Sequence, residues 1–193
     1  MTLVEYRENF EQGSNRAVSM PIAGAIVWAV VAALSTQVDS RFAVYILLFA
    51  TGAIFPLALL IAKFRHENLV SAQNPLAKLM GMCVLMVNLL WAVHIPLLLN
   101  APEFVPLSLG VGLGLHWVVY SWIVSHPVGL IHAVLRAVLI VLAWYVFPDA
   151  RVLAIASVIV LVYLLSIYQM LTRELVLDEI TYTYYVKRLK NQP

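Results

Sequence analysis

Charged residues are scarce in this sequence, and so are cysteines. Asp, Glu, Lys and Arg together make up 11% of the 193 residues, whereas hydrophobic residues make up 63%. A typical soluble domain is about 25% charged and about 45–50% apolar. A chain of this length has too small an interior to hide so much apolar surface from water. The composition therefore excludes an ordinary soluble domain and predicts an integral membrane protein.

The lone cysteine and the small net charge exclude further classes. Cys83 has no second cysteine with which to form an intrachain disulfide or a cysteine-based metal site, and its apolar neighbours favour a small packed side chain. The net charge is only +2 and no long basic run occurs, so no nucleic-acid partner is expected. The sequence also has no P-loop and no HExxH motif, so neither a cofactor nor a metal is expected.

Six apolar stretches are long enough to cross a bilayer as helices, which takes about 20 residues each. Most links between them are short, and short links force neighbouring helices to be antiparallel. The predicted fold class is an all-α membrane protein, a compact bundle of about six transmembrane helices built from antiparallel hairpins. Residues 1–193 would form one domain, with short tails and spans at residues 17–36, 42–62, 79–100, 104–125, 127–148 and 152–172.

Lys and Arg are distributed unequally between the two ends of this bundle. Nine lie on the side that carries both termini, and only Arg41 and Arg151 lie on the other side. Cytoplasmic loops of membrane proteins carry the excess of basic residues. Both termini are therefore expected in the cytoplasm.

The two tails have features of membrane-surface segments. Leu3, Tyr6 and Phe10 fall on one side of a helix over residues 2–12, which would lie on the membrane surface; a frayed polar tail is the alternative. A helix is expected to continue beyond the sixth span towards the C-terminus. Its basic residues would contact anionic lipid headgroups or serve as a solvated topology signal, and they are Lys187, Arg188 and Lys190.

A tight turn at His126 joins the fourth and fifth predicted spans and fixes the depth of polar residues on both. His116 lies ten residues before His126, and Arg136 lies ten residues after it. At ~1.5 Å per residue, both would be about 15 Å from the turn, near the bilayer centre. Tyr120 and His132 are each six residues from His126 and would form a second polar level nearer the cytoplasm.

Small and polar residues also recur along one side of each of these helices. A four-residue repeat on the fourth span is expected to face His132 and Arg136 on the fifth, where Gly129 permits close approach. The repeat consists of Ser108, Gly112, His116 and Tyr120.

Arg136 is the only formal charge within a predicted span, and no Asp or Glu lies in any span to neutralise it. An arginine stays ionised in proteins and costs ~2.5–3.5 kcal/mol at the centre of an inserted helix. It must therefore meet polar side chains, backbone carbonyls, water or an anionic ligand, and both a functional and a structural role fit. The histidines could relay protons or hydrogen-bond within the bundle. The predicted ligand or pathway residues are Arg136, His116, His132, Tyr120, Asn88 and Tyr163.

Short motifs in the first third of the chain resemble a known family. They are EYRENF at residues 5–10, PIAG at residues 21–24 followed by Trp28, and GAIFPL at residues 52–57 before a basic loop. Together they resemble DUF7010, a family of small bacterial membrane proteins of about this length whose function is uncharacterised. The resemblance implies a multi-pass protein of the bacterial inner membrane, and it transfers no site residues.

Three functions fit these observations. The favoured one is a small-solute or anion transporter or channel with a polar site at mid-membrane. The alternatives are a structural or accessory membrane subunit, and an intramembrane lipid-binding protein or enzyme that holds a headgroup against Arg136. No nucleophile–base pair is evident, so no catalytic residue is predicted. The expected partners are the lipid bilayer and an anionic small molecule or lipid headgroup, and so small a bundle is also compatible with a homo-oligomer.

Overall fold

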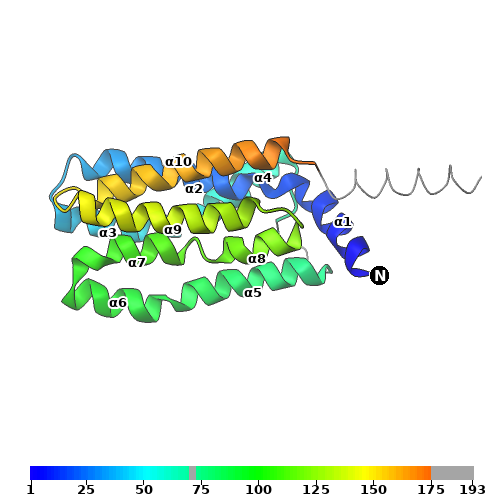
Figure 1. Ribbon diagram of the computed structural model, residues 1–193, viewed down its shortest axis with the longest axis horizontal. Coiled ribbons are helices and arrows are strands. Elements are labelled where there is room, and N and C mark those ends of the chain that lie inside the picture. Colours follow the sequence, from blue (N-terminus) through cyan, green and yellow to red (C-terminus); the bar gives the residue numbers. More distant parts are fainter. Residues whose placement is uncertain (70–72, 175–193) are drawn as a thin grey trace, which may run out of the picture.

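The computed structural model describes residues 1–69 and 73–174, and every regular element in these ranges is a helix. The helices run up and down along one long axis, and α1 lies across one end of the bundle (Figure 1). The predicted all-α fold class is therefore confirmed. The helix expected beyond the sixth span, and the basic cluster of Lys187, Arg188 and Lys190, lie outside the described residues.

Five helical stretches are long and apolar enough to cross a membrane, and a bent pair supplies a sixth, as the sequence predicted. The bent pair consists of α3 (Ser40–Gly52) and α4 (Ile54–Arg65), which meet at 41°. Pro56 explains the bend, because a proline ring clashes with the carbonyl four residues earlier, here that of Gly52. The five stretches are Leu3–Ser35, Pro75–Asn100, Pro102–Ile123, Val128–Val146 and Arg151–Thr172.

Three of these stretches are themselves interrupted. The first contains α1 (Leu3–Ser14), a short 3-10 turn η1 (Asn15–Ala17) and α2 (Ser19–Ser35). The second contains α5 (Pro75–Leu89) and α6 (Trp91–Asn100). The third contains η2 (Pro102–Phe104), α7 (Val105–Gly112) and α8 (His116–Ile123). Only the last two stretches, α9 (Val128–Val146) and α10 (Arg151–Thr172), are single helices.

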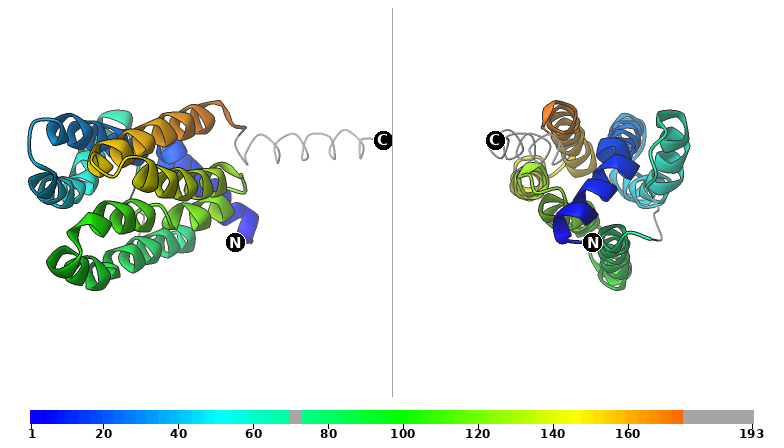
Figure 2. Two further views of the ribbon diagram at one scale, coloured as in Figure 1. Left: turned by 60° about the vertical axis from the view of Figure 1, so that its left-hand side comes forward. Right: turned by 90° about the vertical axis from the view of Figure 1, so that its right-hand side faces the viewer.

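The N-terminal helix α1 turns sharply away from the span that follows it. Asn15, Arg16 and Ala17 all have positive φ, with Arg16 at 70°, so the helix cannot continue straight into α2. Seen from that end, α1 crosses the ends of the other helices (Figure 2, right). We call this the α1 end, and the opposite end, with the loops after α2, α6 and α9, the far end. The predicted helix in the N-terminal tail is confirmed.

The core lies where α2, α9 and α10 pack together, with α3, α4, α7 and α8 around them. Trp28, Ile140 and Ile159 are fully buried there. The outer faces are strongly apolar instead of polar: Phe49 is 78% exposed and Leu99 is 76% exposed. Such an outer surface suits lipid, which is as apolar as these side chains. The protein is thus a multi-pass membrane protein with a bilayer as its environment.

Candidate functional site

Arg136 is completely buried in the middle of α9, with 0% of its surface exposed. Its Nε donates a hydrogen bond to the Gly110 carbonyl at 2.7 Å, and its Nη1 lies 3.5 Å from Nε2 of His132. The centre of the guanidinium is 5.6 Å from the ring of Trp28 and 5.4 Å from that of Tyr163. A carbonyl, an imidazole and two aromatic faces therefore surround the cation.

The Gly110 carbonyl is available because the third long stretch is broken beside it. In a continuous helix it would accept a hydrogen bond from the amide of Gly114, but this amide donates instead to Val111 at 2.8 Å. Gly114 also leaves room for the arginine, since a Cβ at this position would lie 3.0 Å from Cδ of Arg136. The break between α7 and α8 (Figure 1) therefore supplies both an acceptor and a passage for the buried side chain.

The hydrogen bonds of His132 indicate its protonation state. The Ser166 hydroxyl lies 2.8 Å from the Val162 carbonyl and 2.8 Å from Nδ1 of His132, and donation to the carbonyl leaves it an acceptor for an Nδ1–H. With its proton on Nδ1, a neutral imidazole offers the lone pair of Nε2 to Nη1 of Arg136. A cationic imidazole would instead set one N–H against another. The chain of hydrogen bonds thus favours a neutral His132 beside a cationic Arg136.

Aromatic rings hold His132 in place. The indole of Trp117 stacks on the imidazole with ring centroids 3.9 Å apart and an angle of 12°, and the Tyr163 ring is tilted at 5.1 Å. Gly24 of α2 packs directly against the Tyr163 ring, because a Cβ at Gly24 would lie 2.5 Å from Cζ of Tyr163. The neighbours of the cation therefore have little room to move.

The cluster has spare hydrogen-bond donors. In the described part of the chain, Nη2 of Arg136 and Nε1 of Trp28 are both buried without an acceptor. Buried donors are nearly always paired in proteins, and these two belong to groups in contact with each other. A small anion that reached Nη2 would accept a hydrogen bond and offset the charge of the guanidinium.

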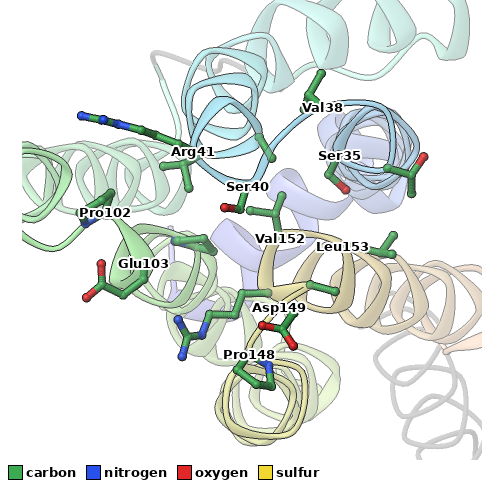
Figure 3. A pocket seen from close by; sticks show the side chains of 16 residues that line it. Ser35, Val38, Ser40, Arg41, Pro102, Glu103, Pro148, Asp149, Val152 and Leu153 are labelled. Carbon is green, nitrogen blue, oxygen red and sulfur yellow. The ribbon is translucent and has the colours of Figure 1, made fainter.

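Two cavities lie on either side of this cluster along the bundle. The far cavity, of about 550 Å³, is bounded by the loop after α2, the start of the third long stretch and the loop after α9 (Figure 3). Its charged residues are Arg41, Glu103, Asp149 and Arg151. The near cavity, of about 530 Å³, lies towards the α1 end between α2, α4, α5 and α8, and its lining is mostly apolar.

The broken α7–α8 stretch contributes to both cavities. Pro106 of α7 lines the far cavity, and Trp117 of α8 lines the near cavity. Gly110 and Gly114, which contact Arg136, fall between these two residues in the chain. Arg136 itself lines neither cavity, whereas Trp117, which stacks on His132, lines the near cavity.

The structure brings together three of the six predicted site residues, Arg136, His132 and Tyr163. His116 and Tyr120 instead line the near cavity, where the Tyr120 hydroxyl donates to the Arg16 carbonyl at 3.3 Å. Asn88 lies apart from the cluster. It is exposed on α5, and its Nδ2 donates to the Val84 carbonyl of its own helix at 2.8 Å.

The expected orientation of the four-residue repeat is wrong for its first half, and its second half, His116 and Tyr120, lines the near cavity. Ser108 lies 3.1 Å from Nδ1 of His94 on α6, and a Cβ at Gly112 would lie 3.7 Å from Nε2 of the same histidine. Gly110 and Gly114 contact Arg136 instead. The cause is the break after α7, where 3-10 hydrogen bonds with about three residues per turn interrupt the regular repeat.

Sequence reasoning missed Gly110 and Gly114 and did not assign Trp28 or Trp117 to the site. A signal for the break is nevertheless present, since residues 110–114 read GVGLG, three glycines within five positions of a predicted span. Glycine weakens a helix interior and permits close approach of other groups. The expected role of Gly129 is confirmed, because a Cβ there would lie 2.0 Å from the Trp117 carbonyl oxygen.

Comparison with known proteins gives one match. The model of a family of unknown function, DUF7010, matches residues 3–173, which is nearly all of the described chain. No curated protein and no solved structure matches the chain.

Proposed function

The chain belongs to the DUF7010 family, whose function is unknown, and from its own geometry we propose that it binds a small anion at Arg136 and passes it across the bilayer. The observation that carries this proposal is the buried guanidinium with an unpaired Nη2, next to the unpaired indole Nε1 of Trp28. A small anion is the ligand that these donors suit.

The charge balance supports an anion. The ion pairs of the described residues, such as Glu11 with Arg173 and Arg65 with Glu67, lie at the α1 end, and none includes Arg136. An ion buried without a counter-charge is costly, because its lost hydration is only partly replaced by dipoles. Binding of an anion would return part of this free energy.

The arrangement of the cavities supports a route. One cavity lies towards each end of the bundle, Arg136 lines neither, and the broken α7–α8 stretch borders both. Interrupted helices that expose backbone groups near mid-membrane are common at the binding sites of transporters. In this proposal the structure is a closed state, and movement at the break would connect the cluster to one cavity at a time.

The proposal includes an orientation and a location. The α1 end would face the cytoplasm of a bacterium and the far end would face outward, with the bundle in the inner membrane. The excess of Lys and Arg on the side of the two termini supports this orientation.

Flux measurements test the proposal. Purified protein in vesicles should conduct at least one of chloride, nitrate, thiocyanate and formate, and Arg136→Gln should lower the flux at least tenfold. Lys63→Gln is the matched control, because it removes one positive charge from an exposed position on α4. Equal flux in wild type and Arg136→Gln would refute the proposal, as would a wild type that is inert to all four anions. Unfolding temperatures identify any variant that fails to fold.

A structural role for Arg136 is the second candidate, because Nε and Nη1 already have acceptors within the bundle. If Arg136 only supports the fold, its replacement should lower the unfolding temperature and no anion should raise that of the wild type. A ligand that binds the folded state stabilises it by mass action, so anion-dependent stabilisation distinguishes the two candidates.

A further inference from the structure

We propose that the near cavity is a binding site for an anionic phospholipid, which enters from the bilayer between α4 and α5 and places one acyl chain inside. The site does not include Arg136, but it is the cavity that the anion route would use towards the α1 end, so a lipid bound there would have to leave before an anion could pass.

The walls of the near cavity are open to the lipid. α4 packs on α2 and α3, and α5 packs on α8 and α1, whereas α4 and α5 do not pack closely on each other along their described residues. The two helices are well separated when the bundle is viewed from the α1 end (Figure 2, right). Phe55 of α4 lines the cavity and is half exposed, so the wall continues onto the lipid-facing surface.

The lining of the near cavity changes from apolar, deeper in the bundle, to polar at the α1 end, as a phospholipid changes from acyl chain to headgroup. Deeper in the bundle its lining includes Met20, Phe55, Met80 and Val84, which suit a hydrocarbon chain. From Lys78 in the first turn of α5 to Val84, the helix rises about 9 Å along this wall. The volume of about 530 Å³ lies within the range of ligand pockets, about 300–1,000 Å³.

Polar groups gather where the headgroup would lie. Lys78 is exposed and is the only formally charged residue among the described residues of the lining. Ser14, at the end of α1, is buried and its hydroxyl has no hydrogen-bond partner in the described chain. Asn68 completes the polar end of the cavity. An ammonium, a hydroxyl and an amide without any carboxylate favour a headgroup with net negative charge over a zwitterionic or cationic one.

A crosslinking experiment tests the site. The full-length protein is reconstituted in phosphatidylcholine vesicles with a trace of phosphatidylglycerol that carries a diazirine on its acyl chain, and the adducts are mapped by mass spectrometry. We expect them to concentrate on Met20, Phe55 and Met80. The contrary result is labelling spread evenly over lipid-facing positions such as Phe49 and Leu85, which are exposed on α3 and α5.

Gly81→Trp should lower this labelling at least fivefold, because Gly81 lines the cavity and a Cβ there meets no atom within 4 Å. Met82→Trp, at the neighbouring exposed position, is the matched control and should leave it unchanged. Lys78→Gln should abolish the preference for phosphatidylglycerol over a phosphatidylcholine probe. If Gly81→Trp labels like wild type, the site is refuted.

Failure of this proposal is distinguishable from failure of the anion route. Arg136→Gln should keep the labelling pattern of wild type, because Arg136 does not line the near cavity. Loss of the pattern in a folded Arg136→Gln protein would contradict the separation of the two sites.

Discussion

Ser166 has a single hydroxyl proton, and its donation to the Val162 carbonyl makes the serine the acceptor for His132. Both groups are completely or almost completely buried. A buried donor that loses its acceptor cannot find water to replace it, and this costs about 1–3 kcal/mol. One small side chain on α10 therefore decides which nitrogen of His132 faces the guanidinium.

We expect Ser166→Ala to lower the free energy of unfolding by about 1–3 kcal/mol, because Nδ1 of His132 is left unpaired. The measurement is thermal or denaturant unfolding in detergent. Ser157→Ala, at an exposed position on the same helix, should change stability by less than about 0.5 kcal/mol. A loss in Ser157→Ala as large as that in Ser166→Ala would contradict the role of the buried hydrogen bond.

At the scale of elements, the close approach of α8 and α9 depends on a backbone contact at Gly129. Gly129 faces the Trp117 carbonyl, and a Cβ would lie 2.0 Å from this oxygen. Trp117 in turn stacks on His132, so the helix separation also fixes the position of the imidazole. Membrane helices use small residues in this way where their backbones approach closely.

Gly129→Ala should therefore force α8 and α9 apart. We expect it to lower the free energy of unfolding by ~1–3 kcal/mol, the loss typical of overpacking. Gly81→Ala is the control, since its Cβ would meet open space. Unfolding temperatures compare the two variants. Two variants of equal stability would show that the close approach is not required.

The helix α1 is fastened to the bundle by a buried ion pair. Nη2 of Arg173 lies 2.7 Å from both carboxylate oxygens of Glu11, and both side chains are almost fully buried. Arg16 adds bonds of 2.8 and 2.7 Å to the carbonyls of Met170 and Arg173 at the end of α10. The N-terminal helix is thus tied to the end of the last span.

Removing one partner of a buried ion pair leaves the other charge uncompensated and typically costs about 3–5 kcal/mol. We expect Glu11→Gln to release α1, seen as faster hydrogen exchange over residues 3–14. The paired change of Glu11→Leu with Arg173→Met should restore much of the protection, because no unpaired charge remains. Slow exchange in Glu11→Gln would mean that other contacts hold α1 in place.

The sequence was informative about some elements and silent about others, for physical reasons. Hydropathy predicted about six spans, in agreement with the five or six long apolar helical stretches, because lipid requires about 20 apolar residues whatever they pack against. Counting from His126 placed Arg136 at mid-span, since helical rise is nearly constant. The break after α7 and the Gly110 acceptor depend on tertiary packing around the cation, and a helical repeat drawn through residues 108–120 could not include them.

At the scale of the whole molecule, the two ends of the bundle differ in charge. Lys63 lies at the end of α4 towards α1, and Asp149 lies in the loop after α9 at the far end; both are exposed. In the proposed orientation the first would lie in the cytoplasm and the second outside.

Labelling with a membrane-impermeant maleimide checks this orientation. In a Cys83→Ala background, Asp149→Cys should react in intact spheroplasts, and Lys63→Cys should react only after permeabilisation. The opposite pattern would invert the proposed topology, and equal labelling of both positions would indicate two orientations in the membrane.

The hydrogen-bonded chain that begins at Arg136 ends at a backbone carbonyl, and this restricts what could travel with an anion. A carbonyl cannot accept a proton and pass it on, so the path through His132 and Ser166 stops at Val162. On the proposed route no proton would then accompany the anion by this path. Its crossing would transfer net charge. The negative interior of a cell would favour outward movement of the anion by about 2.3 kcal/mol for each 100 mV of membrane potential.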